Sequence, residues 1–304
     1  MRYSLTSRVR GTLLGGLLGQ SLAATEGVES YDWNSRVVQS MESLIVQGGF
    51  DVDEWNKSNP GQWNVELSCN LMLVKVILAT LPIALFFYEN KIKLRENLLL
   101  AIKNNNDSNI RDGVLAVCYL IAQSLSEKIN PNTLVAEINS FIGETTTDLP
   151  IKLQQVNNLI VKNGGSTELQ NCLGKENSIS NIIAVAFYSF ANTREDFRLT
   201  CLQAIQYKYD SQACGAIAGA ISGTYNSMAG IPITWHLGLD EAKLAQWGFT
   251  SFSQMVKLAD ALVAVWSGAY RVSPQLLDRK EARDKDLIFS PNEAIAAPYI
   301  IRLR

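Results

Sequence analysis

The sequence predicts an all-α fold, and three observations support this. Apolar residues recur at the three- and four-residue spacing of a helix along most of the chain. Most of these runs begin at a proline or at a residue type that caps helices. Alternating apolar and polar runs bounded by Asn-Gly or Asp-Gly turns, which would indicate β-hairpins, are missing. With 304 residues, 47% of them hydrophobic and 18% charged, the chain can bury a sizeable core, which excludes intrinsic disorder.

The first expected helix contains the apolar stretch Gly11–Leu18. Arginines precede this stretch and Ala23-Ala24 follows it, so the segment also mimics a secretory signal. Four glycines between Gly11 and Gly19 dilute the apolar character. We therefore expect a buried first helix in place of a cleaved signal.

The next two helices are expected at Val37–Ile45 and at Leu71–Tyr88. The first follows the cap-type residues Asp32 and Asn34, and Gly48-Gly49 ends it. The second is 18 residues long with Lys75 as its only charge, which is just long enough for a membrane span. Because Pro82 interrupts it and no second candidate span exists, we expect a helix buried in the protein and no membrane partner.

The other expected helices follow further cap residues and prolines. They begin after Asp107, Pro131 and Pro150 and lie at about 178–191, 195–207, 211–223, 240–246 and 252–270. Asp51 and Asp53 open like a calcium loop, but Trp55 stands where an oxygen ligand belongs, so they indicate the first turn of a helix. No linker and no repeat divides the chain, which predicts one compact domain over residues 1–304.

Two of these helices carry glycines at four-residue intervals. Each glycine costs about 1 kcal/mol of helix propensity relative to alanine, so three on one face need compensation from a close neighbour. We expect both helices to lie at the centre of the bundle, against close neighbours or against each other. The glycines are Gly11, Gly15 and Gly19 in the first helix and Gly215, Gly219 and Gly223 in the second.

Charge and residue counts exclude several classes of function. The net charge of -2 leaves no basic excess for nucleic acid. His236 is the only histidine, which excludes zinc sites built from two or three imidazoles, and its sequence neighbours favour a structural role. The five cysteines are odd in number and lack a C-x-x-C spacing, so we expect buried thiols in the reducing cytoplasm.

Several motifs, in order along the chain, resemble the ADP-ribosylglycohydrolase family. Arg10–Gly15 with Gly19 resembles its opening R-G-x-L-L-G…G-D motif. The segments 43–44 and 48–51 resemble the end of the helix that follows its T-D-D-T motif. Residues 186–210 and 216–220 resemble the helices around its G-G-D-T-D-T motif, and Gly230-Ile231-Pro232 with Trp235 resembles a later signature. The resemblance implies an all-helical, dimagnesium hydrolase that releases ADP-ribose.

The positions of the family's metal ligands depart from its pattern. Aligned on Glu42-Ser43-Leu44, the segment 31–34 stands in place of T-D-D-T and retains one carboxylate, Asp32, beside Trp33. Aligned on 216–220, the segment 208–213 stands in place of G-G-D-T-D-T. It retains Asp210, but Gln212 and Ala213 replace an acid and a hydroxyl, and Lys208 is added. Because hard cations need oxygen-rich cages, this set should attract Mg²⁺ poorly, and no cofactor is expected.

The resemblance also implies changes in the regions that bind substrate. Gln20 replaces the acid of the opening motif, and the glycine-rich substrate loop falls on Leu73-Val74-Lys75 and Leu78-Ala79, which contain no glycine and no arginine. The asparagine run 104–106 replaces the family's T-H pair. If the site survives, Asp32 and Asp210 are its catalytic residues and the ligands of a single metal. Each is also an ordinary helix N-cap candidate.

Three functions follow as alternatives. The first is a pseudoenzyme that has lost the dimagnesium site and the hydrolase activity and uses the scaffold to bind an ADP-ribose-like ligand or a protein partner. The second is an active ADP-ribosyl or related N- or O-glycoside hydrolase with an altered or single-metal site, in which Asp32 and Asp210 act as acid and base. The third, an unrelated helical interaction protein, explains the composition but not the ordered motifs. The first two differ in whether Asp32 and Asp210 converge on a cleft or each cap a helix.

Overall fold

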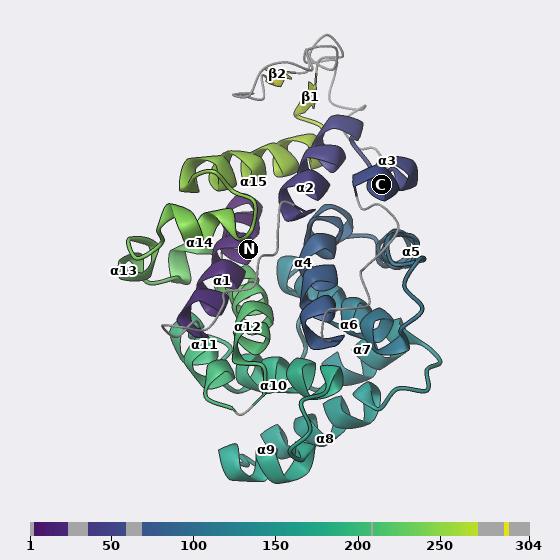
Figure 1. The fold of residues 1–304 in the computed structure, drawn as a ribbon, viewed down its shortest axis with the longest axis vertical. Coiled ribbons are helices and arrows are strands. Elements are labelled where there is room, and N and C mark those ends of the chain that lie inside the picture. Colours follow the sequence, from purple (N-terminus) through teal and green to yellow (C-terminus); the bar gives the residue numbers. More distant parts are fainter. Residues whose placement is uncertain (1–2, 24–35, 59–68, 208, 273–288, 292–304) are drawn as a thin grey trace.

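The computed structural model describes residues 3–23, 36–58, 69–207, 209–272 and 289–291, and within them helices dominate (Figure 1). The first nine are α1 (Leu5–Ala23), α2 (Arg36–Gln47), α3 (Val52–Ser58), α4 (Cys69–Phe87), α5 (Lys91–Ala101), α6 (Ser108–Leu125), α7 (Leu134–Ile142), α8 (Leu149–Val161) and α9 (Ser166–Leu173). The others are α10 (Ile179–Asn192), α11 (Phe197–Ile205), α12 (Ser211–Asn226), α13 (Ile233–His236), α14 (Glu241–Ala245) and α15 (Phe252–Trp266), with a 3-10 turn at Met228–Gly230.

The predicted all-α class is confirmed, with one short addition. Strands β1 (Tyr270–Val272) and β2 (Phe289–Pro291) pair antiparallel. The helix expected over 252–270 therefore ends earlier, at Trp266, where the Ser267 N–H caps it and Gly268 follows at a φ of +75°. Glycine adopts that left-handed conformation without the penalty that a side chain incurs.

The centre of the fold is the pair α1 and α12, which lie side by side (Figure 1). They run antiparallel with their glycine faces in contact. The facing glycines are Gly11 with Gly223, Gly15 with Gly219, and Gly19 with Gly215. A Cβ added to any of these six would meet a carbonyl oxygen of the opposite helix far inside van der Waals distance. The hydroxyls of Thr12 and Thr224 lie 2.8 Å apart across the same interface. The expectation of close neighbours at the centre is confirmed, and of the two arrangements left open the structure has the one in which the glycine helices pack against each other.

The remaining helices surround this pair. Helices α6, α10 and α11 contact α12, while α4 packs on α6 and α2, and α15 lies across α1 and α2. Arg10 of α1 binds Asp260 of α15 through Nε at 2.6 Å and through Nη2. The buried Arg8 donates through Nη1 to the carbonyl of Ser124 at 2.7 Å, which satisfies the carboxyl end of α6. The arginines of the opening segment thus join α1 to its neighbours.

The segment that mimics a secretory signal and the segment long enough for a membrane span are both buried helices, α1 and α4. In α1, all residues from Val9 to Leu18 except Arg10 are buried. In α4, the described side chains from Val76 to Phe86 are buried, and Pro82 lies inside the helix. No helix among the described residues has the length and apolar character to cross a membrane.

Helix caps explain most of the confirmed boundaries. Asp107, Ser178 and Asp196 each accept a backbone N–H in the first turn of α6, α10 and α11. Asp51 accepts the N–H groups of Asp53 and Glu54 at 2.9 Å, which confirms that this segment opens a helix, α3. Such caps stabilise a helix by about 1 kcal/mol each. The helix expected after Pro131 begins three residues later, at Leu134.

Candidate functional site

The start of α12 is the part of the predicted site that the structure describes. Asp210 is the N-cap of this helix, and its Oδ1 accepts the backbone N–H of Ala213 at 3.0 Å. Its own N–H donates to Oδ1 of Asn177 at 3.0 Å. The interpretation of Asp210 as a helix cap is therefore confirmed, and one of its carboxylate oxygens is already a hydrogen-bond acceptor.

The next two positions of the motif face inward. Gln212 is 4% exposed, and its Oε1 has no hydrogen-bond partner within the part of the chain that the structure describes. Ala213 is fully buried and offers only a methyl group. Where the resemblance implies a second acid and a hydroxyl, the structure has a buried neutral amide and a hydrocarbon.

The turn before α12 is anchored to the turn before α10. Tyr209 is buried and its hydroxyl donates to the carbonyl of Gly174 at 2.5 Å. Burial raises the pKa of this phenol, so the hydroxyl keeps its proton for that hydrogen bond. Together with the Asn177 bond to Asp210, this contact fixes where the amino end of α12 lies.

Gln20 lies at the carboxyl end of α1, next to Gly19, which contacts Gly215 near the start of α12. Its side chain is buried, and Oε1 accepts the indole N–H of the fully buried Trp247 at 2.6 Å. Its Nε2 donates to Oε1 of Gln246 at 3.4 Å. The residue in place of the family's acid therefore holds the segment after α14 against α1.

The other predicted positions have mixed outcomes. Asp32, with its neighbours Trp33 and Asn34, lies outside the described residues, as does Lys208, so the proximity of Asp32 to Asp210 stays a prediction.

Leu73–Ala79 is part of the continuous helix α4, so a helix stands where the resemblance implies a substrate loop. Among the described residues, no three His, Cys, Asp or Glu side chains come together as a metal site would need.

His236, the only histidine, ends the short helix α13 and is half-buried. Its ring lies 6.3 Å from that of Phe252, and burial lowers its pKa, so the neutral form predominates at pH 7. Among the described residues it takes part in no ion pair. Its surroundings are those of a packed side chain, as the sequence indicates.

The sequence gives no sign of a second feature, a hollow of about 550 Å³ between α5, α6 and α7. Its lining shares no residue with α1 or α12. The lining residues lie in α5, α6 and α7 or directly before α7. The stretches that form α6 and α7 have the ordinary apolar spacing of amphipathic helices. Only the packing of the three helices brings these residues together.

Comparisons with known proteins agree with the predicted fold and with the family resemblance. The family model described as ADP-ribosylglycohydrolase matches residues 76–271. No curated protein matches the sequence. A solved structure described as "ADP-ribosylglycohydrolase-related protein complex" is similar, with a TM-score of 0.57 and 18% identity over 86% of this chain and 99% of that one. At this identity the likeness concerns the fold. The family model covers more than half of the sequence, and the chain belongs to the ADP-ribosylglycohydrolase family.

Proposed function

We propose that this chain is a pseudoenzyme of the family, which has lost the dimagnesium centre and the hydrolase activity and acts by binding. The observation that carries the proposal is the start of α12. There, one carboxylate caps the helix, and the two following motif positions hold a buried amide and a methyl group.

The donor set at this end of α12 does not fit two Mg²⁺ ions. Two dications at close range repel each other strongly, and proteins hold them with several carboxylates. Here Asp210 supplies one carboxylate whose Oδ1 already accepts a helix N–H, and Gln212 supplies no charge. Asp32 would add a second carboxylate, still short of the family's four.

The buried amide supports a binding role. An amide oxygen that is buried without a partner costs about 1–3 kcal/mol, and a donor from a ligand would remove that cost. Gln212 Oε1 is such an atom within the described residues. A ribose hydroxyl or an amide N–H would satisfy it, which fits an ADP-ribose-like ligand or a protein segment as partner. The free thiols of the four cysteines whose side chains are described agree with a cytoplasmic location, which belongs to the same proposal.

The Oε1 of Gln212, unpartnered among the described residues, also favours a second candidate, a hydrolase with a single metal ion. An amide oxygen is an acceptable ligand for a hard cation, and Asp210, the N-cap of α12, supplies a carboxylate two residues before Gln212. In this candidate, Asp210 and Asp32 would both bind the metal ion and would act as the acid and the base of the reaction.

A turnover assay separates the two candidates. The purified protein is incubated with ADP-ribosyl-arginine and ADP-ribosyl-serine, with and without Mg²⁺, and the release of ADP-ribose is measured. The pseudoenzyme predicts release at the rate without protein under both conditions. Release that depends on Mg²⁺ would contradict it and favour a metal-dependent hydrolase.

A binding experiment tests the retained role. ADP-ribose is titrated against the wild type and against Gln212→Leu, which removes the amide oxygen and keeps an apolar volume. A Kd that rises about tenfold or more in the variant, with a melting temperature no lower than that of the wild type, supports the role of Gln212. Equal binding by both proteins would remove Gln212 from the site.

A further inference from the structure

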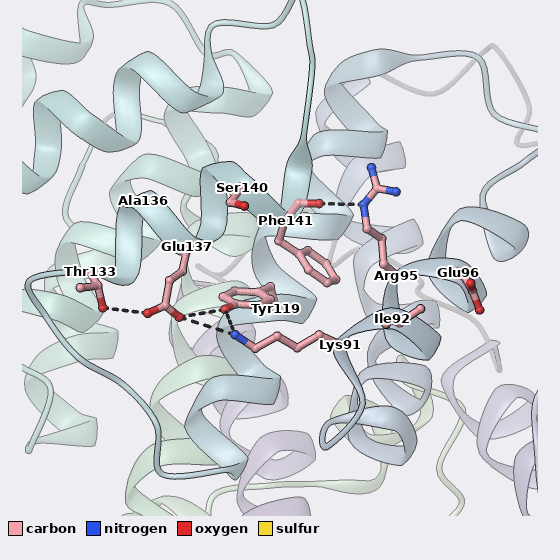
Figure 2. A pocket seen from close by; sticks show the side chains of 10 residues that line it. All are labelled: Lys91, Ile92, Arg95, Glu96, Tyr119, Thr133, Ala136, Glu137, Ser140 and Phe141. Atoms are coloured by element: carbon pink, nitrogen blue, oxygen red, sulfur yellow. Dashed lines mark hydrogen bonds and ion pairs between the residues drawn. The ribbon is translucent and has the colours of Figure 1, made fainter.

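The hollow between α5, α6 and α7 has the features of a second ligand site, separate from the start of α12. At about 550 Å³ it is in the range of pockets that hold small molecules. Figure 2 shows side chains from all three helices, with Lys91 and Glu137 beside the hydroxyl of Tyr119 and Arg95 and Glu96 further to the right. The rings of Tyr119 and Phe141 pack at 4.6 Å between centroids and form an aromatic floor. Ile92, which is 72% exposed, adds an apolar wall at the mouth.

The carboxylate beside this floor, Glu137, already has a cation and two hydroxyl donors as partners. Glu137 accepts the hydroxyl of Thr133 through Oε1 at 2.7 Å and the hydroxyl of Tyr119 through Oε2 at 2.9 Å. Lys91 donates to the Tyr119 hydroxyl at 2.6 Å and pairs with Glu137 at 3.8 Å. The Thr133 bond, followed by those from Tyr119 and Lys91, keeps the pKa of Glu137 below its usual range. The charges of Lys91 and Glu137 therefore balance each other within the hollow (Figure 2).

Arg95 supplies a cation that is held in place but not neutralised. Its Nε donates to the carbonyl of Phe141 at 2.9 Å, and Nη2 donates to that of Ile142 at 3.3 Å. These carbonyls end α7, so they orient the guanidinium without cancelling its charge. No ion pair to Arg95 and no hydrogen bond from its Nη1 occurs among the described residues. Glu96 also lines the hollow, on the far side of Arg95 from Tyr119 in Figure 2.

We propose that this hollow binds a small monoanionic carboxylic acid with an aromatic or branched aliphatic body. The apolar body would lie against Phe141 and Ile92, and the carboxylate would accept the remaining N–H groups of Arg95. A guanidinium whose stem and Nε are fixed suits a planar carboxylate, since the ordering has occurred before binding. A polyphosphate suits the site less, because Arg95 is its one cation without an acidic partner among the described residues and Glu96 is close by.

A titration with 3-phenylpropionate, followed by ligand-observed NMR, tests this assignment. Its neutral analogue 3-phenylpropionamide has the same ring and chain and serves as the ligand control. We expect saturable binding of the acid with a Kd of about 1 mM or tighter and binding of the amide that is weaker by about tenfold or more. Failure of the acid to saturate by about 10 mM, or equal binding of acid and amide, would overturn the proposal.

Three variants locate the binding. Arg95→Gln removes the guanidinium, and Ile92→Glu places a charge at the exposed mouth without disturbing the core. Both should weaken binding of the acid by about tenfold or more. Lys93→Gln is the matched control, because it removes one positive charge from an exposed position on the same helix that does not line the hollow. It should bind as the wild type does.

The outcomes stay interpretable if a variant is unstable. Thermal unfolding of each variant is measured first, and Ile92→Glu tests the site alone if Arg95→Gln does not fold. Equal weakening by Lys93→Gln would show attraction to overall charge, and unchanged binding by Ile92→Glu would place the ligand elsewhere. Either result overturns the proposal. The site shares no residue with the start of α12, so its failure would leave the proposed function untouched.

Discussion

At the scale of single residues, three of the described positions that the family resemblance assigns to chemistry have structural uses in this chain. Asp210 caps α12, and Gln20 accepts the indole N–H of Trp247. Ala213 is packed in the core. Gln212 differs, because its buried oxygen has no partner among the described residues. The start of α12 is thus built as a stable helix end with one unsatisfied acceptor.

Substitutions at Asp210 distinguish capping from metal binding. Asparagine accepts the Ala213 N–H as aspartate does, whereas alanine cannot, so Asp210→Ala should lower the free energy of unfolding by about 1 kcal/mol and Asp210→Asn by much less. Urea unfolding measures both. The difference between the variants should be the same with 10 mM Mg²⁺ and with EDTA. A stability loss in Asp210→Asn that develops only when Mg²⁺ is present would show that the carboxylate binds metal.

At the scale of elements, the pair α1 and α12 organises the fold. Glycine at the three facing positions of each helix allows backbone-to-backbone contact, which larger residues exclude. The spacing of these glycines is visible in the sequence, and it predicted both the helices and their close packing. The register of the pair, with Gly15 opposite Gly219, needed the structure.

Adding one methyl group at this interface should destabilise the protein strongly. In Gly15→Ala, the new Cβ would meet the carbonyl of Gly219, and backbone cannot move aside as a flexible side chain can. We expect a loss of about 1–3 kcal/mol, and a larger one for Gly15→Leu or Gly219→Leu. Gly49→Ala is the matched control, since nothing lies within 4 Å of a Cβ there. Similar urea midpoints for Gly15→Ala and Gly49→Ala would show that the glycine contact has no packing role.

At the scale of the whole molecule, the sequence predicted the class and most helices because apolar spacing and caps are local signals. It gave no prediction for α5, for α9 or for the four-residue α13. In α5, Ile92 and Leu100 are apolar but exposed. In the sequence they therefore hide the helical spacing of the buried residues Leu94 and Leu98. In α9, only Leu169 and Leu173 are buried, too few for a periodic pattern. The prediction of one domain over 1–304 remains untested.

The site was less predictable than the fold. Motif order located Asp210 and Gln212, but only packing reveals that one is a cap and the other is buried without a partner. The hollow depends on Arg95, Tyr119 and Glu137 meeting across three helices, which no local pattern encodes. Asp32 lies outside the described residues, so its relation to Asp210 remains a prediction.

Thiol labelling tests the global packing. Cys118, Cys201 and Cys214 are fully buried, and burial raises the pKa of Cys118 to about 12 and those of the other two as well. Cys172 is half-buried. With iodoacetamide at pH 8, mass spectrometry should find Cys172 alkylated in the native protein and the other three alkylated only in denaturant. Rapid native labelling of Cys118 would contradict the packing of α6.

The central claim, loss of the dimagnesium site, is tested most directly by calorimetric titration of Mg²⁺ into the purified protein. We expect no saturable heat up to about 10 mM, because one capping carboxylate and a buried amide cannot hold two dications. The triple variant Trp33→Asp, Gln212→Asp and Ala213→Thr restores the family's ligand types at three positions and should gain measurable Mg²⁺ affinity. Stoichiometric binding of two Mg²⁺ ions by the wild type would contradict the account.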